Sequence, residues 1–103
     1  MKTELRTRID EFVDEGWPDE EILLFGEGDG DPYDRGFIGI GFQQYRGPIA
    51  IYDAELCIEA LAEEFPGEDA FEDAAEWFGF NTAGAWVGDK TPMVISRFEM
   101  EVP

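Results

Sequence analysis

The sequence contains no histidine and a single cysteine, Cys57, among its 103 residues. Without histidine, the chain lacks the side chain that most often serves as a general base or metal ligand near neutral pH. One cysteine cannot form an internal disulfide or a cysteine-based zinc site. No serine, lysine or tyrosine lies beside an evident base either. We therefore expect no enzymatic activity, no catalytic residue, no metal site and no cofactor.

Long apolar runs are also missing from the chain. No apolar stretch approaches the roughly 18 residues that a membrane span requires, and the polar N-terminus lacks the pattern of a signal peptide. Hydrophobic residues still make up 44% of the chain and aromatic residues 15%, which is enough to build one core. We expect a single domain over residues 1–103, soluble in a reducing cytoplasm.

Positive charge is scarce, because 7 Lys and Arg residues stand against 25 Asp and Glu residues, for a net charge of −18. Such a charge disfavours direct binding to nucleic acid, whose phosphates it would repel, and to anionic membranes. It favours basic protein partners. A second interpretation stays open: the acidity supplies only solubility, or it reflects the proteome of a salt-loving host.

The spacing of apolar residues predicts an α+β fold in one domain. Pro and Gly residues separate the expected elements, and Asp53 is the expected N-cap of the second helix. We expect a small antiparallel sheet of three to four strands with about three helices packed on one face. The expected helices cover 3–15, 53–65 and a segment from 68 or 69 to between 79 and 88. The expected strands cover 22–25, 37–42 and 49–52, with a turn at 46–48 and a fourth strand at an edge within 92–102.

Within the strand expected over 37–42, glycines alternate with large apolar residues. Ile38, Ile40 and Phe42 share one face, and Gly39 and Gly41 share the other. The glycine face leaves room for a bulky group to approach the backbone closely.

Cys57 is predicted to be a core residue. It lies on the apolar stripe of the second expected helix, between Glu55 and Glu59, whose charges would raise the pKa of its thiol. A reactive thiol needs the opposite environment, namely a helix N-terminus or a neighbouring cation.

The acidic loop over 26–36 carries oxygen ligands of the kind that calcium prefers. Asp29, Asp31 and Asp34 could supply oxygen ligands, but an EF-hand needs Gly at its sixth position and Glu at its twelfth. Counting from Asp29 places Asp34 and Ile40 there. We interpret the loop as a connection between strands, with Asp29 and Asp31 as secondary contacts for a partner.

Glutamates recur every four positions along the second and third expected helices, neither of which contains Lys or Arg. Like charges at this spacing destabilise a helix by about 0.2–0.5 kcal/mol per pair. A rise of about 1.5 Å per residue separates the carboxylates by about 6 Å, which is within a factor of two of the phosphate spacing of nucleic acid. Either the rows form a solvated face, or they imitate a polyanion. The first row is Glu55, Glu59 and Glu63; the second is Glu68, Glu72 and Glu76, flanked by Asp69 and Asp73.

A longer pattern connects these segments. It begins with Tyr52 and Asp53 at the end of a strand, continues through a helix, and ends in a segment rich in aromatic residues and glycine. The matching residues there are Ala74, Glu76, Trp77, Phe78, Phe80, Asn81, Gly84, Ala85, Trp86, Gly88, Thr91 and Pro92.

This pattern resembles a family of small uncharacterised proteins common in tailed-bacteriophage genomes. The resemblance covers about 37–95 and leaves 1–36 outside. It implies a phage origin and a compact α+β fold, but no established activity. The motif looks structural: Asn81 and the glycines would end or bend a helix, and Trp77, Phe78, Phe80 and Trp86 would fill the core.

The sequence therefore favours a phage-encoded interaction protein of the host cytoplasm. It would bind and inhibit a basic host protein, such as a CRISPR or restriction nuclease, by imitating nucleic acid. The alternative is a structural or housekeeping phage protein, a small homo-oligomer with Trp17, Tyr33 and Tyr45 in its self-interface. The expected partner-binding residues are Glu55, Glu59, Glu63, Glu68, Asp69, Glu72, Asp73 and Glu76, with Asp29 and Asp31 secondary.

Overall fold

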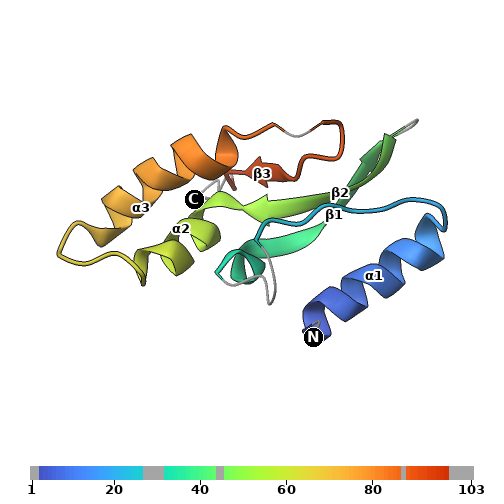
Figure 1. Ribbon diagram of the computed structural model, residues 1–103, viewed down its shortest axis with the longest axis horizontal. Coiled ribbons are helices and arrows are strands. Elements are labelled where there is room, and N and C mark those ends of the chain that lie inside the picture. Colours follow the sequence, from blue (N-terminus) through green and yellow to red (C-terminus); the bar gives the residue numbers. More distant parts are fainter. Residues whose placement is uncertain (1–2, 27–31, 44–45, 87, 98–103) are drawn as a thin grey trace, which may run out of the picture.

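The computed structural model describes residues 3–26, 32–43, 46–86 and 88–97, and it has the predicted α+β arrangement (Figure 1). The described residues form three α-helices, a three-stranded sheet and two short helical turns. In chain order the elements are α1 (Glu4–Gly16), the 3-10 turn η1 (Tyr33–Gly36), β1 (Phe37–Gln43), β2 (Arg46–Asp53), α2 (Ala54–Ala62), α3 (Ala70–Phe78), the π-helical turn η2 (Gly79–Ala83) and β3 (Met93–Ile95).

The sheet is mixed rather than antiparallel, with the strand order β1-β2-β3. β1 and β2 form the expected antiparallel hairpin, but β3 pairs parallel to β2, with Ile51 opposite Met93 and Asp53 opposite Ile95. The α2–α3 pair lies between β2 and β3 in the chain and returns it to the start of the sheet, which makes the pairing parallel. The predicted edge strand is thus confirmed in its position but wrong in its direction. Its expected continuation over 98–102 lies outside the described residues.

Two sequence predictions about the sheet are wrong. The run 22–25 forms no strand: Ile22, Leu24 and Phe25 pack against the core, and the Phe25 N–H donates to the Tyr52 hydroxyl at 3.0 Å. The expected turn at 46–48 forms the start of β2 instead. Pro48 is tolerated there because the pairing of β1 with β2 is irregular between Gly41 and Gln43, and proline within a sheet occurs at such irregularities.

The first helix confirms the prediction for 3–15 to within one residue. The Thr3 hydroxyl caps it by accepting from the Arg6 N–H, and Ile9 and Val13 are buried. The Arg6 guanidinium contacts both Asp34 carboxylate oxygens, at 2.9 and 3.0 Å, and donates to the Phe25 carbonyl at 2.7 Å. These bonds fasten α1 to η1. In Figure 1, α1 and the α2–α3 pair lie at opposite ends of the molecule, and a shared face for all three helices stays a prediction.

The core lies where β2 leads into the α2–α3 pair. Its fully buried centre contains Ala50, Tyr52, Cys57 and Ala74. The predicted apolar stripe of α2 is confirmed, since each of its members belongs to the core or packs against it. In α3, Phe78 is buried as expected, whereas Phe71 is 46% exposed. The stripe comprises Ala54, Cys57, Ile58, Leu61 and Phe65.

Replacing Gly36 with alanine is expected to lower the free energy of unfolding by about 1–3 kcal/mol, as overpacking of a full core does. A Cβ atom at Gly36 would lie 2.3 Å from the Cys57 sulfur and 3.1 Å from the Cys57 backbone nitrogen. Gly39→Ala is the matched control, because a Cβ there meets nothing within 4 Å. Chemical denaturation of both variants measures the difference, and equal stabilities would contradict the packing of η1 against α2.

Candidate interaction surface

The Tyr52–Asp53 pair joins the sheet to α2 and sets the direction of that helix. The Asp53 side chain is 1% exposed, and its Oδ1 accepts from the Leu56 N–H at 3.0 Å as the predicted N-cap. Its Oδ2 has no hydrogen bond within the described residues but forms an ion pair with the Arg97 guanidinium. Both Asp53 oxygens therefore act within the fold, and the pair is structural.

Along α2 the acidic row projects away from the core. Glu55 and Glu59 are exposed, whereas Cys57 and Leu61 are buried, and the 3.6-residue period places these pairs on opposite faces. Glu63 follows the helix as its C-cap and forms an ion pair with Arg35 from η1. The sequence did not indicate this pairing, which reduces the row of unneutralised carboxylates on α2 to two.

The second row begins before its helix. Glu68 and Asp69 lie in the turn that precedes α3, and the Asp69 side chain makes no capping hydrogen bond. Glu72, Asp73 and Glu76 lie on α3 itself, and all three are exposed. They lie away from the buried face that Ala74 and Phe78 define.

Seven of the predicted contact residues therefore are exposed and also have no cation partner in the part of the chain that the structure describes. The described cations pair elsewhere, as Arg6 does with Asp34 and Lys90 with Glu20. Asp29 and Asp31 lie outside the described residues. The seven, called the acidic surface below, are Glu55, Glu59, Glu68, Asp69, Glu72, Asp73 and Glu76.

The helix termini stabilise only part of this charge. Glu55 lies in the first turn of α2, and Glu72 and Asp73 lie in the first turn of α3, where the helix dipole favours an anion. Glu59 and Glu76 lie beyond the first turn, and neither helix has a basic residue in its last turn. The repulsion between Glu55 and Glu59, and between Glu72 and Glu76, is therefore uncompensated within these helices.

Aromatic side chains continue the surface at the end of α3. The sequence predicted that Trp77, Phe80 and Trp86 fill the core, but they are 41%, 80% and 72% exposed. The helix does change there, as expected, into the π turn η2, where the Asn81 amide donates to the Trp77 carbonyl at 3.0 Å. π turns inside helices occur often at functional sites. Only exposure distinguishes these aromatic residues from core residues, and the sequence carries no signal of it.

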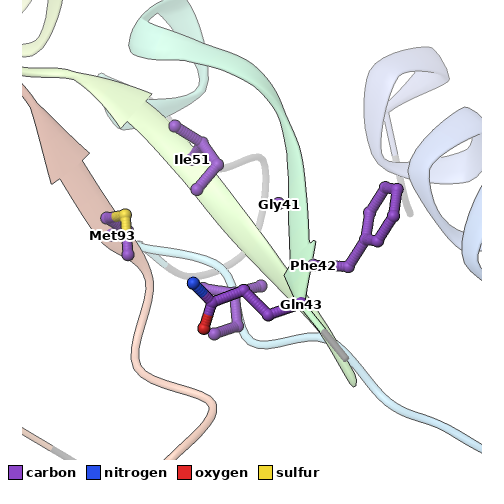
Figure 2. Close-up of a pocket in the computed structure, with 6 residues that line it drawn as sticks. Gly41, Phe42, Gln43, Ile51 and Met93 are labelled. Carbon is purple, nitrogen blue, oxygen red and sulfur yellow. The ribbon is translucent and has the colours of Figure 1, made fainter. Parts of the chain in front are cut away.

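A groove of about 190 Å³ lies on the sheet (Figure 2), and none of the residues that line it belongs to the acidic surface. Gly41 forms part of its lining because Ile51 of β2 leans across it, and a Cβ at Gly41 would lie 2.9 Å from the Ile51 Cδ1. The close approach predicted for the glycine face is therefore made by the chain's own isoleucine. The groove is lined by Gly41, Phe42, Gln43, Ile49, Ile51 and Met93.

Cys57 is buried, as predicted, and burial with the Asp53 charge beside it raises the pKa of its thiol to about 12. Burial also raises the pKa of the Tyr52 hydroxyl to about 12. Both groups are therefore neutral under physiological conditions. Neither is available as a nucleophile.

These two pKa values predict a loss of stability in alkali. The unfolded chain releases the thiol proton near its ordinary pKa of 9.0 and the tyrosine proton near 10.0, whereas the folded chain retains both until about pH 12. The folded state then binds more protons, so its stability falls as the pH rises from about 9 to about 12. Cys57→Ala should move the onset of the loss toward pH 10. Unfolding measured against pH tests this, and an unchanged onset would contradict it.

Comparison of the chain with protein-family models, curated proteins and solved structures finds no match. The resemblance to phage proteins therefore stays a prediction from the sequence. Within the described residues, no helix has both the length and the apolar character needed to cross a membrane.

Proposed function

We propose that this chain is an acidic interaction protein that binds the basic, nucleic-acid-binding groove of another protein and blocks it. The observation that carries the proposal is the acidic surface, seven exposed carboxylates without a described cation partner. A helix maintained for stability alone would place cations among these glutamates, because opposite charges four residues apart stabilise a helix and like charges destabilise it.

The physics of such a surface favours fast binding to a basic partner. Concentrated negative charge steers a cationic surface toward the chain and raises the association rate. Once in contact, carboxylates about 6 Å apart along a helix can pair with the arginines and lysines that would otherwise hold phosphates. When the chain occupies the groove in this way, nucleic acid cannot bind there. If the phage resemblance holds, the blocked protein is a host nuclease of the CRISPR or restriction type.

A pull-down at two salt concentrations tests the proposal. The tagged protein is incubated with lysate of the host, and the captured proteins are identified at about 50 mM and about 200 mM salt, a range over which electrostatic contacts with nucleic-acid-binding surfaces weaken strongly. We expect capture of a basic nucleic-acid-binding protein at low salt and its loss at high salt. Capture that is insensitive to salt, or capture of no basic protein, would reject the proposal.

Self-association is the second candidate function, and the open groove on the sheet favours it. Met93 and Phe42 at its rim are 52% and 67% exposed. The residues first expected in a self-interface support it less, because Tyr33 packs against Phe25 and Phe78, and Trp17 packs against Phe42. Tyr45 lies outside the described residues. Sedimentation at moderate salt separates the two functions: a monomer supports the inhibitor, and a stable oligomer supports a structural protein.

A further inference from the structure

The outer face of α3, together with its N-cap and the start of η2, combines carboxylates with exposed aromatic rings. Two rows run along it at a spacing of four residues, and each starts acidic and ends aromatic. Trp77 and Phe80 are 41% and 80% exposed, and neither has a ring contact with another described residue. The rows, called the α3 ridge below, are Asp69, Asp73 and Trp77, and Glu72, Glu76 and Phe80.

The backbone keeps both rows on one side of the helix. The φ and ψ angles are −61° and −43° at Phe78, and −60° and −42° at Gly79, and both pairs are helical. Helical geometry therefore continues as far as Phe80, and residues four apart along it are neighbours on the surface. Consequently Trp77 lies next to Asp73, and Phe80 lies next to Glu76.

The turn that carries Phe80 is fixed from two sides. The Asn81 amide donates to the Trp77 carbonyl at 3.0 Å, and the buried Thr82 hydroxyl shares a hydrogen bond of 2.9 Å with the Tyr33 hydroxyl. The exposed rings are thus held on an ordered support. Rigid aromatic side chains of this kind contribute strongly to protein interfaces, because they bury a large area with little loss of conformational entropy.

Charge complementarity determines the chemistry of the occupant. A carboxylate beside an aromatic ring matches a guanidinium group, which pairs with the carboxylate through two hydrogen bonds and stacks its plane on the ring. A lysine ammonium is a compact, strongly hydrated charge and fits this combination less well. We propose that the α3 ridge binds arginine side chains of a protein partner in preference to lysine.

This inference rests on the proposed function and makes it more specific. General acidity alone would attract lysine and arginine equally, whereas the α3 ridge selects a partner whose groove presents arginine. Arginine is also the residue that most often contacts nucleic acid through paired hydrogen bonds. The preference of the α3 ridge for arginine therefore favours the class of partner named in the proposed function, a protein with a groove that binds nucleic acid.

Two synthetic peptides of equal length and charge provide the test. One has arginine and the other lysine at each cationic position, alternating with glycine, and calorimetric titration measures the affinity of each for the whole protein. We expect the arginine peptide to bind about tenfold more tightly, because only the planar guanidinium can both pair with the carboxylate through two hydrogen bonds and stack on the ring. The double variant Trp77→Ala, Phe80→Ala should lose this preference, and Phe12→Ala, an exposed aromatic residue of α1, should retain it.

A second pair of substitutions distinguishes failure of the α3 ridge from failure of the proposed function. Glu72→Gln with Glu76→Gln should weaken both peptides, and circular dichroism verifies that each variant is folded. Equal affinity of the two peptides, or a preference that survives loss of both rings, would overturn the α3 ridge but leave the acidic inhibitor intact. If neither peptide binds, or if the glutamine substitutions change neither affinity, the α3 ridge and the proposed function both fail.

Discussion

Replacing Tyr52 with alanine is expected to lower the free energy of unfolding by about 3–5 kcal/mol, the usual cost of truncating a buried aromatic residue. Tyr52 is fully buried, and its ring lies 4.6 Å from that of Phe25 and 5.7 Å from that of Phe37, between centroids. It therefore connects β2 with β1 and with the segment before η1. Because a domain of this size has about 5–15 kcal/mol of stability in total, the variant should be close to unfolding. Urea denaturation followed by circular dichroism measures the loss.

Tyr52→Phe is the matched control for this prediction. It retains the ring but removes the hydroxyl that accepts from the Phe25 N–H at 3.0 Å, and the N–H left without its partner should cost about 1–3 kcal/mol. The phenylalanine variant should thus remain folded with a smaller loss. If Tyr52→Ala cost less than about 1 kcal/mol, well below the range for a buried aromatic residue, the core described around β2 would be wrong.

Reversing the charge of Glu59, Glu72 and Glu76 to lysine is expected to weaken partner binding by about 100-fold. An exposed ion pair contributes about 0.2–1 kcal/mol, and reversal replaces each attraction by a repulsion of similar size. Three reversals together therefore remove about 3 kcal/mol. The fold should survive, because the three side chains are exposed and have no cation partner within the described residues. Affinity for the captured partner, measured by surface plasmon resonance, tests the prediction.

The matched control places the same charge change on another helix. Glu11, Asp14 and Glu15 lie exposed on α1, and their replacement by lysine changes the net charge by an equal amount. This variant should lose association rate through its smaller net charge but retain most of its affinity. Equal losses in the two variants would show that total charge, and not the acidic surface, determines binding.

The local structure of the helices could be predicted from the sequence. Asp53 is the predicted N-cap of α2 and accepts a backbone N–H as expected, and Thr3, the first residue of the first expected helix, caps α1 in the structure. The apolar stripe of α2 was recognisable from its spacing, because the period of a helix determines which side chains face the core. The exposure of Glu55, Glu59, Glu72 and Glu76 follows from the same period.

Contacts between distant segments could not be predicted in this way. The run 22–25 has the composition of a strand, yet it packs on the core without one, and the short β3 pairs in parallel only because α2 and α3 return the chain to β2. The pairing of Arg35 with Glu63 also joins residues far apart in the sequence. Such contacts form only in the assembled fold, and the spacing of apolar residues along the sequence does not predict them.

The aromatic residues after α3 illustrate the same limit at the site itself. Their composition is that of a core segment, and Phe78 does belong to the core. Trp77 and Phe80 lie on the other side of the same turn, where the described residues leave them 41% and 80% exposed. Hydrophobicity alone does not distinguish a core residue from an interface residue.

Competition with nucleic acid tests the central claim most directly. The captured partner is immobilised and loaded with a fluorescent DNA duplex, and the protein is then added in increasing amounts while the bound fluorescence is recorded. Because the acidic surface is proposed to occupy the groove that holds phosphates, the account predicts complete displacement of the DNA, with the variant carrying lysine at Glu59, Glu72 and Glu76 displacing little. A stable ternary complex, in which the protein binds while the DNA stays bound, would contradict it.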